Sequence, residues 1–224
     1  MADRHEAMKR RVARRAVEEV RDGMVVGLGS GSTAGYAIEA LGEAGLDVSG
    51  VATSRAARSR AIAAGVPVVD LEAVDAVDIA IDGADQVAGD TVLKGGGGAH
   101  ALERVVDDLA ERLVVVVDER KPVARLDAPV PLEVLPEARG AVEARLERLG
   151  AEVADRRCAA VDGPVHSERG LILLDADVGP IDDPAALSAT LAELPGVLDH
   201  GLFVGMADEV LVGTAAGVEV RTPG

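Results

Sequence analysis

Three acidic residues and one lysine lie close together near the middle of the chain. Asp82 and Asp85 follow a short apolar run, and Lys94 precedes four consecutive glycines. Glu103 comes shortly afterwards, in a predicted helix. Carboxylates and an ammonium group can exchange protons with a substrate, and glycine amides can approach a ligand closely and stabilise negative charge. This combination therefore predicts proton transfer on a small anionic substrate.

Each of these features has a simpler explanation when it is taken alone. An Asp-Gly pair most often marks a turn, and a glycine run most often forms a flexible loop. The predicted helix has an apolar stripe that consists of Leu102, Val105, Val106 and Leu109. Glu103 lies at the rim of this stripe, which predicts a half-buried carboxylate that could equally be a solvated surface residue. The functional hypothesis depends on the combination.

A second glycine-rich loop, Gly-Ser-Gly-Ser-Thr at residues 29–33, follows a predicted strand at 24–28 and precedes a predicted helix at 34–41. This order places backbone amides and hydroxyls around a phosphate group. The glycine spacing also fits the dinucleotide-binding fingerprint, but the next predicted strand, at 48–53, does not end in the acidic residue which that fingerprint requires. A single phosphate group is therefore the predicted ligand.

Lysine is scarce in this chain, which has only Lys9, Lys94 and Lys121 beside 20 arginines. We interpret the three lysines as positions that need a compact ammonium group instead of a planar guanidinium. Lys121 lies just beyond the carboxyl end of a predicted central strand at 113–117. Ligands bind beyond the carboxyl ends of the strands in open α/β sheets, so Lys121 is a candidate ligand contact, although an exposed loop lysine is the alternative.

The composition argues against several functions. The net charge is −16, with one Tyr, one Phe and no Trp, so the chain lacks both the basic surface and the stacking residues of a nucleic-acid-binding protein. Cys158 is the only cysteine, and the four histidines have no metal-ligand spacing, so we expect no disulfide, no metal and no cofactor. The acidic composition suggests adaptation to high salt.

No targeting or membrane segment is predicted. The first 15 residues are too polar for a signal peptide, and no apolar run approaches the length of a membrane span. We therefore expect a soluble cytoplasmic protein that binds neither membranes nor nucleic acid.

The order of elements predicts an α/β fold with an open, mostly parallel sheet. The expected helices span residues 4–21, 34–41, 55–64 and the segment around Glu103, and the expected strands span 24–28, 48–53, 67–69, 77–81 and 113–117. From residue 128 the pattern becomes β-α-β-β-α-β, which indicates a small ferredoxin-like α+β domain. Its strands are expected at 129–135, 151–157, 170–175 and 197–204, and its helices at 139–149 and 184–194. Two further strands are expected at 209–214 and 217–221.

Considered together, the motifs resemble those of the ribose-5-phosphate isomerase A family over nearly the whole chain. The matching segments are GLGSGST at 27–33, IDGAD at 81–85, LKGGG at 93–97 followed by Glu103-Arg104, the segment 117–121, PLEV at 131–134, PGV at 195–197 and GLF at 201–203.

The resemblance implies roles for individual residues. Glu103 is expected to be the catalytic base, with Asp82, Asp85 and Lys94 as its polar partners. The residues expected to bind the substrate are Ser30, Gly31, Ser32, Thr33, Asp82, Gly83, Ala84, Asp85, Lys94, Gly95, Gly96, Gly97, Lys121 and Lys9.

The resemblance also implies a reaction and an organisation. The expected reaction interconverts D-ribose 5-phosphate and D-ribulose 5-phosphate through an enediolate intermediate, in the non-oxidative branch of the pentose phosphate pathway. The expected catalytic domain comprises residues 1–127 and 200–224, with the small domain, 128–199, inserted between them. A homodimer or homotetramer is expected, because these assemblies are usual for the family.

The chain departs from the family pattern at three places, and two alternative functions stay open. Gln86 occupies a position that is commonly acidic, His100 one that is usually small, and Gly170 or Leu171 one near a common asparagine. The first alternative is a non-catalytic sugar-phosphate-sensing domain, which would not need Glu103. The second is an acyl or CoA transferase with Glu103 as nucleophile, which would call for a larger chain.

Overall fold

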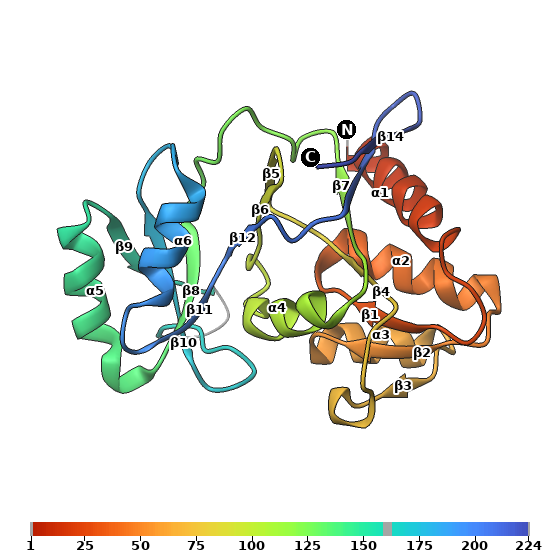
Figure 1. The fold of residues 1–224 in the computed structure, drawn as a ribbon, viewed down its shortest axis with the longest axis horizontal. Helices are drawn as coiled ribbons and strands as arrows, with labels where there is room; N and C mark the ends of the chain where they lie inside the picture. Colours follow the sequence, from red (N-terminus) through yellow and green to blue (C-terminus); the bar gives the residue numbers. More distant parts are fainter. Residues whose placement is uncertain (1, 159–162, 224) are drawn as a thin grey trace. The chain divides into compact units, whose positions relative to one another are not determined.

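The computed structural model describes residues 2–158 and 163–223, and the chain forms two compact units (Figure 1). Unit 1 spans Met1–Ala84, Leu102–Pro122 and Gly205–Gly224, and unit 2 spans Asp85–Ala101 and Val123–Val204. Unit 2 therefore contains residues 85–101, 123–127 and 200–204 in addition to the predicted small domain, 128–199. The reason is that the segment 85–101 pairs with strands of unit 2 and packs on them, as described below.

Unit 1 is built on a seven-stranded sheet with the order β14-β13-β7-β4-β1-β2-β3. The strands are β1 Val25–Leu28, β2 Ser49–Ala52, β3 Val68–Val69, β4 Ile79–Asp82, β7 Leu113–Asp118, β13 Glu209–Gly213 and β14 Val218–Arg221. All neighbours pair in parallel except β13 and β14, which form an antiparallel hairpin. The predicted open, mostly parallel sheet is thus confirmed.

Helices pack on both faces of this sheet. The helices of unit 1 are α1 Ala2–Val17, α2 Gly31–Ala44, α3 Arg55–Ala63 and α4 His100–Leu109, which begins in unit 2, together with the 3₁₀ turn η1 Leu71–Ala73. The apolar sides of α1, α2 and α3 form one core with one face of the sheet, while Val106 of α4 packs with Val51 and Val77 on the other. Because both faces are covered, every residue of β7 is buried, which explains the uninterrupted apolar sequence of residues 113–117.

Unit 2 contains a four-stranded antiparallel sheet with the order β11-β8-β10-β9. Its elements are β8 Val130–Val134, η2 Pro136–Ala138, α5 Arg139–Arg148, β9 Glu152–Asp155, β10 Ile172–Asp177, α6 Pro184–Ala192 and β11 Val197–His200. This is the predicted β-α-β-β-α-β pattern, and its strand order agrees with a ferredoxin-like unit. An aliphatic core, which includes Leu132, Leu146 and Leu174, joins the helices to one face of the sheet.

A second sheet in unit 2 has the order β12-β6-β5, with β5 Gln86–Ala88, β6 Thr91–Leu93 and β12 Leu202–Val204. The prediction of one strand over 197–204 is wrong, because the chain leaves one sheet after β11 and enters the other at β12. Gly201 lies at the break, where its N–H donates to Pro131 and its C=O accepts from Lys94. A Cβ at Gly201 would lie 2.2 Å from the carbonyl oxygen of Lys94, so only glycine fits between the two sheets.

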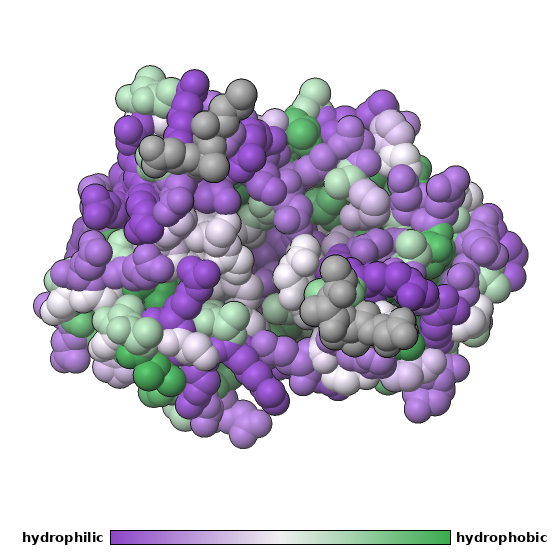
Figure 2. All heavy atoms as spheres, turned by 180° about the vertical axis from the view of Figure 1, so that it is seen from behind, coloured by the Kyte–Doolittle hydropathy of each residue, from purple (hydrophilic) through white to green (hydrophobic). Residues whose placement is uncertain are grey.

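The apolar residues on the surface do not form a continuous patch in the face that Figure 2 shows, where hydrophilic residues dominate. The most exposed large apolar side chains come from separate elements, namely Ile62, Val105, Leu135, Leu149, Leu198 and Val220. Scattered apolar residues are normal on a protein surface. Within the described ranges, no helix combines the length and apolar character that crossing a membrane would require.

Candidate active site

The loop of residues 29–33 in unit 1 leads from β1 into α2, which begins at Gly31, earlier than the sequence predicted. Ser30 is the N-cap residue of α2, yet its side chain makes no capping hydrogen bond. The first amides of a helix attract anions, particularly where no side chain caps them. A pocket of about 230 Å³ lies here, lined by Gly29–Ser32, Gly35, Ala56, Ala57 and Arg60. The uncapped helix start and the pocket are compatible with phosphate binding by the loop, which stays a prediction.

The Ser30 hydroxyl is already bound within the protein. Its Oγ lies 2.9 Å from Thr53 Oγ1 and donates to Ser54 Oγ at 2.8 Å. Ser54 in turn caps α3 by accepting from the N–H of Ala57 at 3.1 Å. These bonds tie the loop to the start of α3, so Ser30 orders the pocket through its side chain.

Lys9 lies beside the same loop. Its Nζ donates to Ser32 Oγ at 2.7 Å, although α1 and the loop are separated in sequence. Ser32 itself is exposed at the start of α2. An ammonium group at this position adds positive charge to the N-terminus of the helix, where the helix dipole also favours an anion.

Asp82 lies at the carboxyl end of β4 and is only 1% exposed. Its Oδ1 accepts from the N–H of Ser30 at 3.0 Å and from the N–H of Gly83 at 2.6 Å. A Cβ at Gly29 would lie 2.0 Å from Asp82 Oδ1. The buried carboxylate thus fixes the loop of residues 29–33, and the glycine is required for this close approach.

Lys121 follows the carboxyl end of β7 in a turn that Asp118 and Arg120 stabilise. The N–H of Lys121 donates to the carbonyl of Asp118 at 3.0 Å. Hydrogen bonds from the Arg120 guanidinium to the buried Asp118 carboxylate lower the pKa of Asp118 to about 2. The carboxylate therefore stays ionised at neutral pH and holds the turn in which Lys121 lies.

In unit 2, Lys94 follows β6 and is almost completely buried, with 2% of its surface exposed. Its Nζ lies 4.7 Å from the centre of the Phe203 ring, a cation–π contact. Phe203 is the only phenylalanine of the chain, and the only tyrosine, Tyr36, likewise contacts a cation, the guanidinium of Arg10. The scarcity of aromatic residues could have identified Phe203 from the sequence, in the same way that the scarcity of lysine identified Lys94.

The glycine run after Lys94 forms a tight loop. The N–H of Gly96 donates to Asp85 Oδ2 at 2.8 Å, and the N–H of Gly98 donates to the carbonyl of Gly95 at 2.9 Å. Gly95 and Gly98 have φ angles of +104° and +70°. The amide of Gly96, a predicted ligand contact, and the amide of Gly98 therefore bind within the protein, and neither bond involves the N–H of Gly97.

Glu103 lies in the first turn of α4 and is 4% exposed. It is more deeply buried than its predicted rim position suggested. Val105, which the sequence analysis placed in the apolar stripe, is instead 51% exposed, while Val106 and Asp107 are buried. The predicted stripe is wrong at Val105 because this helix buries two acidic side chains, and an apolar periodicity cannot reveal a buried face that includes carboxylates.

Gln86, one of the departures from the family pattern, has a defined role in unit 2. Its side-chain oxygen accepts from the N–H groups of Asp127 and Ala128, and its amide nitrogen donates to Asp127 Oδ1. A carboxylate at this position could accept the two N–H bonds but could not donate to Asp127. The glutamine can therefore form a hydrogen bond with the carboxylate of Asp127, which a carboxylate at residue 86 could not form.

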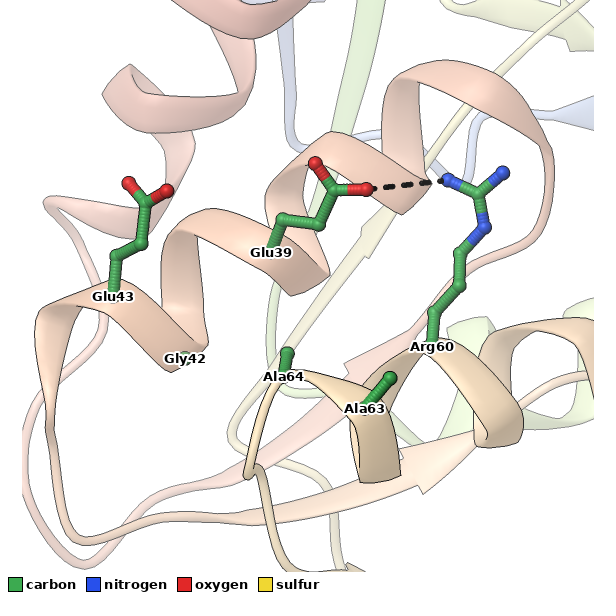
Figure 3. Close-up of a pocket in the computed structure, with 6 residues that line it drawn as sticks. All are labelled: Glu39, Gly42, Glu43, Arg60, Ala63 and Ala64. Carbon is green, nitrogen blue, oxygen red and sulfur yellow. Dashed lines mark ion pairs between the residues drawn. The ribbon is translucent and has the colours of Figure 1, made fainter.

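Arg60 is a lining residue that the sequence analysis did not consider. It lines the pocket beside residues 29–32 and also a larger pocket of about 410 Å³ between α2 and α3. Figure 3 shows Arg60 and Glu39 pointing toward each other in this larger pocket, and their ion pair measures 3.8 Å. The other residues that line it are Gly42, Glu43, Ala63 and Ala64, so none of the predicted site residues is among them.

The histidine and cysteine side chains that the structure describes are not grouped as metal ligands. His100 is buried, with its Nδ1 3.8 Å from Glu133 Oε1, and His200 is buried beside Ser188. Cys158 is free and exposed. Within the described part of the chain, no group of three or more His, Cys, Asp or Glu side chains is arranged to hold a metal ion.

The fold and these side chains define a class of protein: an α/β protein with a glycine-rich loop before an uncapped helix N-terminus and with buried acidic and basic groups. This combination is typical of enzymes that act on small phosphorylated molecules. Comparison with known proteins identifies the family. The family model for ribose 5-phosphate isomerase A (phosphoriboisomerase A) matches residues 49–217. The chain belongs to this family, as its motifs predicted.

Relatives and solved structures agree over nearly the whole chain. Ribose-5-phosphate isomerase A of Haloarcula marismortui is 54% identical over 220 residues, which cover 97% of this chain and 96% of the relative. The structure of ribose 5-phosphate isomerase A from Methanocaldococcus jannaschii has 41% identity, a TM-score of 0.93 and coverage of 97% and 99%. A D-ribose-5-phosphate isomerase structure in complex with phospho-erythronic acid has 40% identity, a TM-score of 0.94 and coverage of 97% and 98%.

Proposed function

We propose that the chain interconverts D-ribose 5-phosphate and D-ribulose 5-phosphate through an enediolate intermediate, with Glu103 as the base. Family membership supports the reaction, and the sugar-acid phosphate in a related structure supports the ligand class. The observation that most directly supports the residue roles is the burial of Asp82, Lys94 and Glu103, each at most 4% exposed. Burial of ionisable side chains is unfavourable, so such residues concentrate where their chemistry is used.

Glu103 moves the carbon proton. In the direction from aldose to ketose, its carboxylate removes the proton from C2 and returns it to C1. One carboxylate can serve both carbons because they are adjacent on the same face of the enediolate. Burial removes the water that would otherwise solvate the carboxylate, which strengthens it as a base when the substrate is bound.

Lys94 stabilises the negative charge that develops on oxygen as the enediolate forms. A buried ammonium acts more strongly than an exposed one, because the surrounding dielectric is low. Its contact with Phe203 restricts the position of Nζ, so the ammonium group needs to move little as negative charge develops on the substrate. Lys94→Arg is expected to be severely impaired, because a planar fork replaces a point charge.

Asp82 and Asp85 transfer the hydroxyl protons and assist the opening of the sugar ring. In the forward direction O2 loses a proton and O1 gains one, so a carboxylate must serve each oxygen in turn. The hydrogen bonds that Asp82 accepts from two amides, and Asp85 from Gly96, hold both side chains in defined positions. Fixed positions reduce the entropy that must be lost in the transition state.

The phosphate of the substrate binds at the N-terminus of α2. Residues 30–33 provide amides and hydroxyls there, while Lys9 and Lys121 provide positive charge. This binding is remote from the carbon atoms that react. Its free energy therefore serves to orient the reacting end of the substrate.

The test is proton NMR of the purified chain with ribose 5-phosphate in heavy water at molar potassium chloride. We expect ribulose 5-phosphate to form, with deuterium entering at the carbon that exchanges its proton. Glu103→Gln should lose nearly all turnover, at least about 1,000-fold, while it retains substrate binding. Glu111→Gln, a substitution at an exposed glutamate just after α4, is the matched control and should behave as the wild type.

Two other results would contradict this proposal, the first in the role of Glu103 and the second in the activity itself. Retention of more than a few per cent of the activity by Glu103→Gln would refute the base assignment. Binding of ribose 5-phosphate without conversion by the wild type would favour the alternative function, a non-catalytic sugar-phosphate sensor.

The environment and assembly are part of this proposal. We place the chain in the cytoplasm as a homodimer or homotetramer, adapted to high salt through its net charge of −16. Salt screens the repulsion between carboxylates, so the melting temperature should rise with potassium chloride concentration. Light scattering at molar potassium chloride would measure the mass of the assembly, and a monomer would exclude the oligomer.

A further inference from the structure

The glycine loop of unit 2 lies on the face of the four-stranded sheet that α5 and α6 leave uncovered. Val130, Leu132 and Val134 of β8 pack with these helices in one core. The alternate residues of β8 meet the loop, because a Cβ at Gly95 would touch Pro131, and Glu133 accepts from the N–H of Ala101 at 3.0 Å. The sheet is therefore a platform on which the loop rests.

Arg156, directly after β9, connects this platform to the loop. Its Nε donates to Asp175 Oδ2 at 2.9 Å, and its Nη2 donates to Asp175 Oδ1. Its Nη1 donates to the carbonyl of Gly95 at 2.6 Å and to the carbonyl of Gly96 at 3.2 Å. One edge of the guanidinium therefore binds a carboxylate of β10, and its remaining nitrogen binds two consecutive carbonyls of the loop.

These bonds fix the orientation of two peptide planes. The C=O and the following N–H of a planar trans peptide point in opposite directions. The peptide between Gly95 and Gly96 is held at both ends, by Arg156 at its carbonyl and by Asp85 at its N–H. The peptide between Gly96 and Gly97 is held by Arg156 at its carbonyl, so the N–H of Gly97 is turned away from the platform.

We propose that Arg156 is a positioning residue for the isomerase reaction: it orients the Gly97 N–H as a hydrogen-bond donor to the enediolate oxygen and keeps the loop aligned with Asp85. This inference rests on the proposed function of the chain. Gly97 is exposed, and a Cβ built on it meets nothing within 4 Å, so its backbone can be approached by a ligand. A donor already oriented toward developing charge stabilises the transition state more than the ground state.

The chemistry of arginine suits this position. The guanidinium presents five donors in a rigid plane, so it can bind a carboxylate in a bidentate manner and still reach two carbonyls. A lysine could not make all these bonds from one ammonium group without changing their geometry. The side chain of Arg156 is 18% exposed and that of Asp175 is 27% exposed, so the ion pair is shielded enough to be well ordered.

The loop has other supports that would maintain the fold without Arg156. Gly98 closes a turn on Gly95, Glu133 binds the amide of Ala101, and β6 remains paired with β5 and β12. Loss of Arg156 should therefore alter the orientation of the two peptide planes more than the stability of unit 2. This separation allows a positioning role to be distinguished from a purely structural one.

The experiment compares Arg156→Met and Arg156→Lys with the matched control Arg157→Met, a substitution at the neighbouring exposed arginine. We expect Arg156→Met to lower kcat about 100-fold while KM changes less than about threefold, because the lost contribution is made in the transition state. Arg156→Lys should remain impaired by at least about tenfold. The melting temperatures should differ little, and Arg157→Met should match the wild type in every measurement.

Chemical rescue provides the second measurement. Added guanidinium ion at millimolar concentration should restore part of the kcat of Arg156→Ala and leave Arg157→Ala unchanged. The inference is overturned if Arg156→Met keeps kcat within about threefold of the wild type, if its loss follows a matching loss of stability, or if guanidinium restores nothing. A wild type that does not isomerise ribose 5-phosphate would instead refute the proposed function, so the two failures are distinguishable.

Discussion

The two glycine-rich loops of this chain resemble each other in sequence but differ in what their glycines do. Residues 29–33 connect β1 to α2 in unit 1, and residues 95–98 connect β6 to α4. In the first loop a single glycine, Gly29, makes a close approach, to the carboxylate of Asp82. In the second loop Gly95, Gly96 and Gly98 would each place a Cβ within 3 Å of another side chain.

The difference shows that a glycine run need not indicate a ligand at every position. Most of the second run is required by its packing on Pro131, Leu173 and the carboxylate of Asp85, and Gly97 is the position whose Cβ would meet open space. The first loop instead leaves the uncapped N-terminus of α2 available to an anion. The second loop is thus shaped mainly by protein contacts, and the first leaves the start of a helix without a side-chain cap.

The largest effect is expected for Gly29→Ala. Its Cβ would lie 2.0 Å from Asp82 Oδ1 and 2.6 Å from Asp82 Cα, so both the loop and β4 would have to move. We expect the free energy of unfolding to fall by about 3 kcal/mol, measured by urea denaturation. Gly31→Ala, whose Cβ meets nothing within 4 Å but whose φ is +91°, should lose only about 1–2 kcal/mol. Equal losses would contradict the assigned role of Gly29.

Comparing Gly95→Ala with Gly97→Ala separates the glycine of the second loop that packing requires from the one that a ligand can approach. Gly95 has a positive φ, and its Cβ would lie 2.8 Å from His100 Nδ1 and 2.9 Å from Pro131, so we expect a loss of about 2–3 kcal/mol in stability. Gly97→Ala should leave stability within about 0.5 kcal/mol but lower kcat/KM about tenfold, because its methyl group would face the ligand. Wild-type kinetics for Gly97→Ala would mean that no ligand approaches this backbone.

Lys9→Met tests the first loop as an anion site. The ammonium bonded to Ser32 should contribute to binding of the phosphate equally in the ground and transition states. We therefore expect KM for ribose 5-phosphate to rise about tenfold with kcat nearly unchanged, measured by steady-state kinetics. Arg14→Met, a substitution at an exposed arginine on the same helix, is the control. A fall in kcat without a change in KM would place Lys9 in the chemistry instead.

The smallest effect is expected for Arg60→Met. Arg60 lines the pocket beside residues 29–32, but its side chain is 45% exposed and is paired with Glu39. Solvent and the carboxylate therefore both weaken its electric field. KM should rise about twofold to threefold without a change in kcat. The same change in Arg58→Met, which alters an arginine of α3 that pairs with Asp70, would show that only general charge matters.

The sequence predicted the alternation of strands and helices in both units because apolar runs and periodic patterns report burial directly. The antiparallel tail hairpin and the ferredoxin-like order followed from short strands and turn residues. The sequence prediction failed at residues 197–204, because the change of sheet at Gly201 depends on hydrogen bonds to Pro131 and Lys94, which are distant in the sequence. The predicted burial of Val105 was also wrong, because the buried face of α4 includes Glu103 and Asp107.

The sequence by itself determined the family, the sheet architecture and the identities of the candidate catalytic residues, since these depend on motifs and on local patterns. Tertiary structure alone decided the partners of these residues: Lys9 with Ser32, Lys94 with Phe203, and Arg156 with the glycine loop. Each pair joins residues far apart in the chain, and a local pattern contains no information about which distant segments meet. The physical reason is that these contacts are set by strand order and by packing on a sheet face.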